Sequence, residues 1–151
     1  GGYMESILNV ASYIIKKYEG NIDEMKLHKL LYFIQRESLA MTGECLFYEG
    51  FRAWKYGPVS PKVRMFLNKK FDFLIKDIEV KNKYIVDNIL MQYGKMDSWE
   101  MSMLTHKEKA WINAKGGKTI KFSDLKEDAE KIRPYDSFWD MYCDEFEDYD
   151  R

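Results

Sequence analysis

The sequence is poor in cysteine, in long apolar runs and in net charge, and each shortage argues against a class of protein. Its two cysteines, Cys45 and Cys143, form no CxxC pair, which fits a reducing compartment such as the cytoplasm better than a disulfide scaffold. No apolar run approaches the ~20 residues that span a bilayer, and no signal peptide is visible, so we expect no membrane partner. A net charge of −1 lacks the basic excess that duplex nucleic acid normally demands.

The sequence also lacks a recognisable reaction centre. The two histidines, His28 and His106, do not combine with the cysteines at the spacing of a zinc site. The run AKGGKT at 114–119 imitates the end of a phosphate-binding P-loop, but Ile112 stands where the motif needs glycine, and the run follows a predicted helix instead of a strand. No nucleophile has a recognisable base near it in the sequence. We therefore predict no catalytic residue, no metal, no cofactor and no enzymatic activity.

Aromatic residues are abundant, and acidic residues are concentrated at one end. Aromatics make up 16% of the chain, and such side chains supply large contact areas in cores and at interfaces alike. The last 16 residues, 136–151, hold seven acidic side chains and one arginine, whereas the rest is mildly basic. We expect this segment to be an acidic, aromatic C-terminal helix or tail. The three residues before Met4 are expected to be a cloning remnant.

Apolar residues recur at helical spacing through most of the chain. They predict helices from 7 to 18, from 27 to near Gly43, over 85–93 and 99–104, and in shorter segments elsewhere. The second helix is expected to be amphipathic, with its leucines on one face and His28 on the surface. Sequence pairs typical of helix N-termini begin at Asn21 and Thr105, and Ser123 is a further candidate cap.

A short hairpin is predicted between the second and third helices. Residues 46–48 and 51–56 flank the turn pair Glu49-Gly50. The Gly-Pro pair at 57–58 is expected to end the second strand, and Ser60 is expected to cap the next helix. The predicted fold class is therefore mainly α with a small β-hairpin (α+β), in one compact domain.

Two surfaces have the side-chain types found at protein interfaces. The hairpin places aromatic residues beside Arg52 and Lys55, although Trp54 and Tyr56 also suit a role as a cover over the helices beneath. The tail places aromatic residues among carboxylates, although a closing helix with a solvated end explains that pattern too. The candidate partner-binding residues are Tyr32, Arg52, Trp54, Lys55, Tyr56, Tyr135, Phe138, Trp139, Tyr142, Asp144 and Glu145.

The run from 26 to 63 strongly resembles the Panacea antitoxin domain, also called SocA-like. That family has approximately KLQKLLYYAQ, then LTG-x-x-LF-x-E, then AW-x-YGPV-x-P-x-V. The chain matches it at Leu27, Lys29, Leu30, Leu31, Tyr32, Gln35, Gly43, Leu46, Phe47, Glu49, Ala53, Trp54, Tyr56, Gly57, Pro58, Val59, Pro61 and Val63. His28 stands where the family usually has Gln, and Arg36, Glu37 and Ser38 replace a more aromatic triplet. The resemblance spans roughly residues 5–115, and we assign 4–135 to the domain and 136–151 to the tail.

The resemblance implies an antitoxin of a bacterial or phage toxin–antitoxin system. Members of that family neutralise unrelated toxins, including alarmone-synthetase-like translation inhibitors, and the family has no assigned catalytic residues. We expect direct binding to a cognate toxin in a hetero-oligomer, with the toxin's active or substrate site blocked. Two alternatives stay open: an adaptor that delivers the toxin to a protease, as in one branch of the family, and a DNA-binding regulator of its own operon. The mildly basic body permits the second, but no recognition helix supports it.

Overall fold

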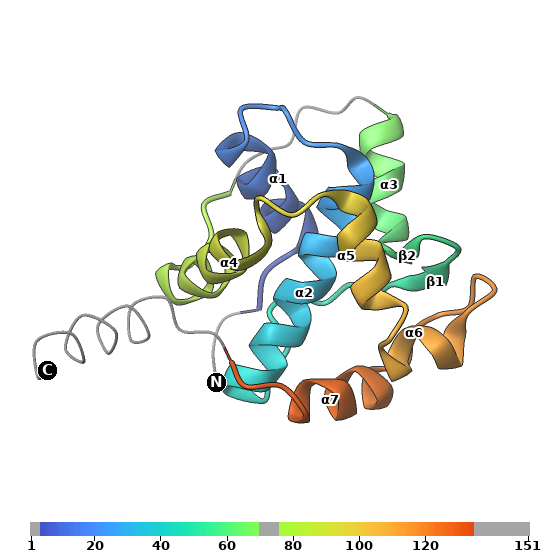
Figure 1. Ribbon diagram of the computed structural model, residues 1–151. Coiled ribbons are helices and arrows are strands. Elements are labelled where there is room, and N and C mark those ends of the chain that lie inside the picture. Colours follow the sequence, from blue (N-terminus) through green and yellow to red (C-terminus); the bar gives the residue numbers. More distant parts are fainter. Residues whose placement is uncertain (1–3, 70–75, 135–151) are drawn as a thin grey trace, which may run out of the picture.

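The computed structural model describes residues 4–69 and 76–134. Within them the chain forms seven helices and a two-stranded hairpin (Figure 1). In chain order the elements are α1 (Ile7–Lys17), α2 (Glu24–Thr42), β1 (Arg52–Trp54), β2 (Gly57–Val59), α3 (Pro61–Asn68), α4 (Val80–Tyr93), α5 (Ser98–Thr105), α6 (Lys109–Ala114) and α7 (Phe122–Glu130). The predicted fold class, mainly α with a small hairpin, is confirmed. The tail at 136–151 lies outside the described residues.

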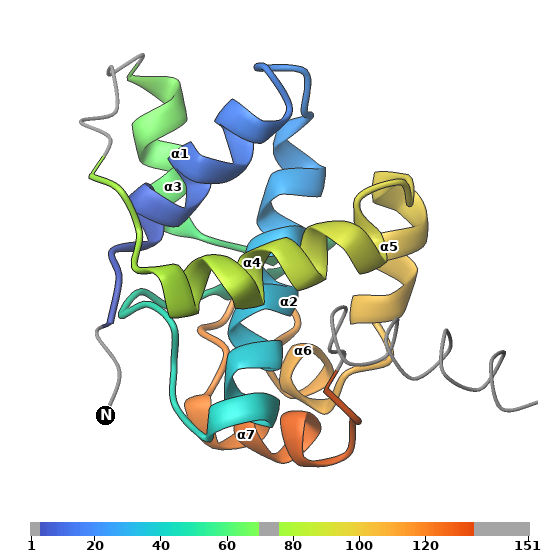
Figure 2. The same cartoon turned by 90° about the vertical axis from the view of Figure 1, so that its left-hand side faces the viewer.

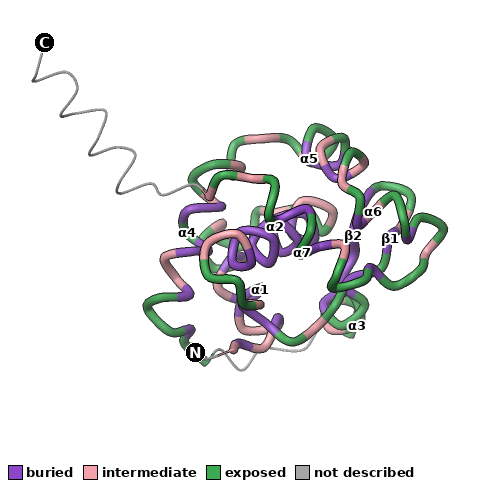
Figure 3. The backbone as a smooth tube through the Cα atoms, turned by 90° about the horizontal axis from the view of Figure 1, so that it is seen from below, coloured by how far each residue is buried: buried purple, intermediate pink, exposed green. Residues whose placement is uncertain are grey.

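The other elements pack around α2, which is the central helix (Figure 2). Helices α1, α4, α5 and α7 and strand β2 all contact it. Every residue from Leu27 to Leu39 is buried, as the tube in Figure 3 shows along α2. The expectation of an amphipathic helix is therefore wrong, because enclosure on all sides leaves this stretch no solvent face. Its polar side chains are buried with the leucines and need partners inside the protein.

The start of α2 differs from the prediction by two residues. Asp23, not Asn21, is the N-cap, and its carboxylate accepts the N–H of Lys26 at 2.8 Å. Asn21 belongs instead to the turn that ends α1, where its N–H donates to the carbonyl of Tyr18 at 2.9 Å. The helix ends at Gly43, as predicted, with the glycine in the left-handed conformation at φ 77°.

The hairpin lies further along the chain than predicted. Strands β1 and β2 are antiparallel, with Trp54 opposite Gly57, so that Lys55 and Tyr56 form the turn. The predicted turn fails because the Glu49 carboxylate is held at the start of α1, where it accepts the N–H of Ile7 at 2.9 Å. A carboxylate at this position also stabilises the positive end of the helix dipole.

Pro58 lies inside β2 and does not end the strand, contrary to the prediction. It is tolerated because its cross-strand partner Ala53 directs its own hydrogen bonds to the other side. The N–H of Ala53 donates to the carbonyl of Lys118, and its carbonyl accepts the N–H of Gly117, both at 2.9 Å. Residues 117–120 therefore lie along the outer edge of β1.

Two further predicted caps are replaced by other contacts. Thr105 is the last residue of α5, and its hydroxyl donates to the carbonyl of Ser102. The start of α6 is capped from α7, where the Asp128 carboxylate accepts the N–H groups of Lys109 and Ala110 at 3.3 and 2.8 Å. Ser123 lies within α7, whose first turn has no side-chain cap. The predicted cap at Ser60 is confirmed, since its hydroxyl accepts the N–H of Val63.

Candidate functional site

The hairpin, α3 and the first turns of α2 surround an open hollow of about 540 Å³. We call it the hairpin hollow. Its volume falls within the range of small-ligand sites, but it opens on the same face as the exposed hairpin turn. Its walls are Glu24, Met25, His28 and Lys29 of α2, Trp54, Lys55, Tyr56 and Val59 of the hairpin, and Arg64 of α3.

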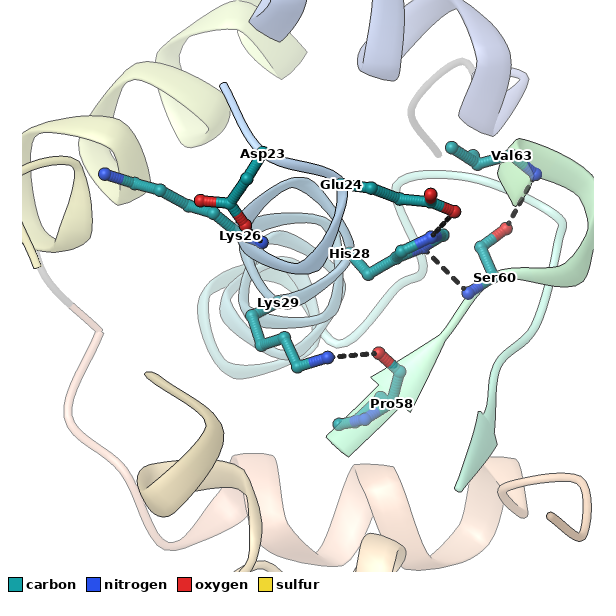
Figure 4. A network of polar contacts seen from close by, with 8 residues as sticks. All are labelled: Asp23, Glu24, Lys26, His28, Lys29, Pro58, Ser60 and Val63. Atoms are coloured by element: carbon teal, nitrogen blue, oxygen red, sulfur yellow. Dashed lines mark hydrogen bonds and ion pairs between the residues drawn. The ribbon is translucent and has the colours of Figure 1, made fainter. Parts of the chain in front are cut away.

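Lys29 forms the floor of the hairpin hollow, and its charge is poorly compensated. The residue is 1% exposed, and its ammonium donates to the carbonyl of Pro58 at a long 3.4 Å (Figure 4). No carboxylate among the described residues forms an ion pair with it. Burial lowers the pKa of Lys29 to about 8, against the opposing effect of Asp23 and Glu24. The ammonium therefore stays mostly charged at neutral pH, although burying it costs stability.

Gly57 makes room for the Lys29 side chain. Its φ of +114° is a conformation that residues with a Cβ rarely adopt. A Cβ at this position would also lie 2.7 Å from Cε of Lys29 and 2.7 Å from the hydroxyl of Thr105. The turn of the hairpin and the place of the lysine thus depend on the same glycine.

His28 is 2% exposed, so the expectation of a surface residue is wrong. Its Nδ1 accepts the N–H of Ser60 at 3.1 Å, and its Nε2 lies 3.2 Å from a carboxylate oxygen of Glu24 (Figure 4). Because Nδ1 must accept from an amide, the ring hydrogen sits on Nε2 and is donated to Glu24. Burial lowers the pKa of His28 in spite of Glu24. The neutral ring therefore ties α2 to the start of α3.

Trp54 is the common wall of three hollows. Besides the hairpin hollow, it lines one of about 320 Å³ next to α3 and one of about 510 Å³ next to α6. The guanidinium of Arg64 lies 4.6 Å from its ring centroid, which is a cation–π geometry. The charged walls of the three hollows are one acidic side chain, Glu24, and six basic ones, Lys29, Arg52, Lys55, Arg64, Lys69 and Lys115.

The turn of the hairpin exposes a second aromatic contact. Tyr56 is 46% exposed and Trp99 of α5 is 59% exposed, and their rings meet edge to face at 5.2 Å. The ammonium of Lys55 lies 5.4 Å from the Tyr56 ring. This surface therefore offers partly exposed aromatic rings among cations, the mixture that carries most binding energy at protein interfaces.

The structure brings together four of the predicted partner-binding residues. Arg52, Trp54, Lys55 and Tyr56 lie on the hairpin and line or adjoin these hollows. The candidate Tyr32 could contact a partner only if part of it were exposed, and it is not. The residue is 0% exposed and packs edge to face on two phenylalanines of the core, because α2 is enclosed on all sides. The tail candidates Tyr135, Phe138, Trp139, Tyr142, Asp144 and Glu145 lie outside the described residues.

Sequence reasoning missed two residues that shape the site, Lys29 and Arg64. In the sequence Lys29 stands out only as a position that matches the family pattern, although an ionisable residue between predicted core leucines is itself a signal of a special environment. Arg64 gave no signal, because its position over Trp54 depends on how α3 packs against the hairpin.

The described residues contain no group of three His, Cys, Asp or Glu side chains placed to hold a metal ion. Nor does any helix among them combine the length and the apolar character required to cross a bilayer. The chemistry that the site does offer is attraction for negative charge and for aromatic or apolar groups.

The comparison with protein families gives one match, over residues 27–112, to the family described as antitoxin SocA-like, Panacea domain. The match covers more than half of the chain and includes the hairpin, α3 and all of α2 beyond its first turn. No curated protein and no solved structure matches the chain significantly. The chain belongs to the SocA-like antitoxin family and carries its Panacea domain.

Proposed function

We propose that this protein neutralises a cognate toxin by binding it directly and covering its active or substrate site. The family is one of antitoxins, which supports the general role. The observation that carries the direct contact is the hairpin surface, which we define as Arg52, Trp54, Lys55, Tyr56, Arg64 and Trp99. The complex forms in the cytoplasm, is a hetero-oligomer, and buries on the order of 1,600 Å².

The charges suggest two contacts of opposite sign. The hairpin surface is basic around its aromatic rings and suits an acidic patch on the toxin. The tail at 136–151 is acidic and aromatic and suits a basic patch, such as the substrate site of an enzyme that handles RNA or nucleotide phosphates. An alarmone-synthetase-like translation inhibitor has such a site, and complementary charge would speed association and fix the orientation.

The experiment that tests the hairpin contact uses the double variant Lys55→Glu/Tyr56→Ala. Both side chains are exposed, so the fold is expected to survive, and we expect the affinity for the toxin to fall at least tenfold. Tyr48→Ala is the matched control, because Tyr48 is 73% exposed and does not line the hairpin hollow. Equal affinity of the double variant and the control, measured by calorimetry, would overturn the hairpin contact.

The tail contact is tested by truncation after Tyr135. We expect weaker neutralisation of toxin in growing cells, with an unchanged helical circular dichroism spectrum from the core. Unchanged toxin affinity would show that the tail is not a contact. The abundance of toxin in the same cells separates simple occlusion, which leaves it constant, from delivery to a protease, which lowers it.

A further inference from the structure

The hairpin hollow is suited to bind one side chain of a partner protein. The observation that points to such a ligand is the buried lysine at its floor, Lys29. Lys29 is 1% exposed, lines the hollow, and has a single long hydrogen bond to Pro58 and no ion-pair partner among the described residues. A buried ammonium normally has a carboxylate beside it. A negatively charged group placed in the hollow would therefore interact favourably with Lys29.

The neighbours of Lys29 do not neutralise its charge, and some of them add to it. At the start of α2, the carboxylate of the N-cap Asp23 accepts the N–H of Lys26, and that of Glu24 accepts the ring N–H of His28. Lys55 on the hairpin and Arg64 on α3 line the same hollow and add positive charge. The apolar part of the wall comes from Met25, Trp54 and Val59.

The geometry favours a carboxylate on an apolar stem over a phosphate. Phosphate sites usually present several backbone N–H groups at a helix start. Here the start of α2 is capped by Asp23 and the start of α3 by Ser60, so neither offers a free cradle. Glu24 also lies in the wall and would repel a dianion more than a monoanion.

We propose that the hairpin hollow binds an Asp or Glu side chain of the toxin, carried beside an apolar or aromatic residue, and that Lys29 is its charge partner. This inference rests on the proposed function and names the chemistry of the contact. The four-carbon stem of Lys29 lets its ammonium turn from Pro58 toward the hollow without movement of the α2 backbone. Trp54 and Val59 then cover the apolar part of the incoming segment.

The first test uses the full chain alone, with indole-3-propionate as a carboxylate on an aromatic stem and its neutral amide as the matched probe. We expect the acid to shift the NMR signals of the Lys29 Cε and the Trp54 indole N–H saturably, and to bind at least tenfold more tightly than the amide. In Lys29→Met the preference for the acid should fall at least tenfold, leaving only the weaker contribution of Lys55 and Arg64, whereas Lys126→Met, a change at an exposed lysine of α7, should keep the full difference.

Three outcomes would overturn the proposal. The first is equal binding of acid and amide to the wild-type chain, or a preference for the acid that Lys29→Met leaves undiminished. The second is displacement of the acid by inorganic phosphate at lower concentration and equal ionic strength, which would make the hollow a phosphate site. The third is tighter acid binding after the tail carboxylates Asp140, Asp144 and Glu145 are replaced by amides, which would make the chain's own tail the occupant.

The second test uses the toxin. We expect Lys29→Met to weaken toxin binding at least tenfold, and one Asp→Asn or Glu→Gln change on the toxin to have no further effect in that background. Toxin binding by Lys29→Met at wild-type strength would overturn the anchor and leave the proposed function intact. A wild-type chain that fails to bind toxin would refute the proposed function, while the result with the indole probes would still decide what the hollow binds.

Discussion

The two halves of α2 bury polar side chains in different ways. In the C-terminal half, the amide of Gln35 donates to the carbonyl of Phe47 at 2.8 Å and accepts the N–H groups of Leu46 and Phe47 at 2.8 and 3.3 Å. The hydroxyl of Ser38 donates to the carbonyl of Glu44 at 2.7 Å. In the N-terminal half, Lys29 has one long hydrogen bond and lies against an open hollow.

This difference separates structural polar groups from those available for binding. Gln35 fixes the chain that returns after α2, because its amide takes the place of a strand partner for residues 46–47. Lys29 fixes no segment to a comparable degree, and within residues 4–69 and 76–134 its buried charge has no carboxylate as an ion-pair partner. A buried polar group that makes all of its hydrogen bonds stabilises the fold. One that makes only some of them and lies beside an opening can form the missing interactions with a binding partner.

The largest expected effect is on the C-terminal half, through Gln35→Leu. Leucine fills a similar volume but leaves three hydrogen bonds to backbone groups of 46–47 unmade inside the protein. We expect the free energy of unfolding to fall by about 3 kcal/mol, measured by urea titration. Gln92→Leu, at an exposed position of α4, should change it by less than about 0.5 kcal/mol. A loss for Gln35→Leu no larger than this control would mean that the amide does not hold the segment.

The features of the fold that depend on neighbouring residues in the sequence were predictable, and those that depend on contacts with other elements were not. Helix spacing, the Ser60 cap and the terminal Gly43 are local, so sequence predicts them. The hairpin shifted because Glu49 is held by the start of α1, and α6 is capped by Asp128 from α7. Such partners come from other elements, and no local pattern of residues indicates them.

The site was predicted only in part for the same reason. Arg52, Trp54, Lys55 and Tyr56 are adjacent in sequence, and their types already indicated an interface. Tyr32 and His28 were misplaced because their exposure depends on the elements that enclose α2. Arg64 reaches Trp54 only through the packing of α3.

A gain in stability is expected from Lys29→Met, the matching change in the N-terminal half. Burial lowers the pKa of Lys29 to about 8 from its ordinary 10.5, so the folded state holds the proton less tightly than the unfolded state. Removal of this group is expected to stabilise the protein by about 2 kcal/mol at pH 7, after loss of the bond to Pro58 is allowed for.

The pH dependence of the stability gained by Lys29→Met tests whether the gain comes from removing a buried cation. Between pH 8 and 10.5 the unfolded chain binds more protons at this position than the folded protein does, so wild-type stability should rise with pH relative to the variant. The gain of Lys29→Met should therefore shrink across this range, as urea titrations at pH 7, 8, 9 and 10 would show. A constant gain would mean that the lysine is not a buried cation, and a loss at pH 7 would mean that its bond to Pro58 outweighs its burial.

The smallest expected effect concerns His28. Burial lowers the pKa of His28 from its ordinary 6.5, so the unfolded chain takes up a proton first as the pH falls. Wild-type stability that is fully present above pH 6.5 should be lost as the pH falls toward the folded pKa. A protonated ring also has no lone pair for the N–H of Ser60, which it accepts at Nδ1.

Glutamine keeps a carbonyl oxygen that can accept the Ser60 N–H and does not titrate in this range. His28→Gln should therefore match the wild-type unfolding free energy at pH 7 to within about 1 kcal/mol and should lose less of it at pH 5. The difference between the two urea titrations isolates position 28, because the chains share every other titrating group. Parallel curves down to pH 5 would mean that folding does not lower the pKa of His28. A flatter curve for the variant would show that the N-terminal half of α2 responds to pH through His28, whereas Gln35 and Ser38 in the other half have no ionisable group with which to respond.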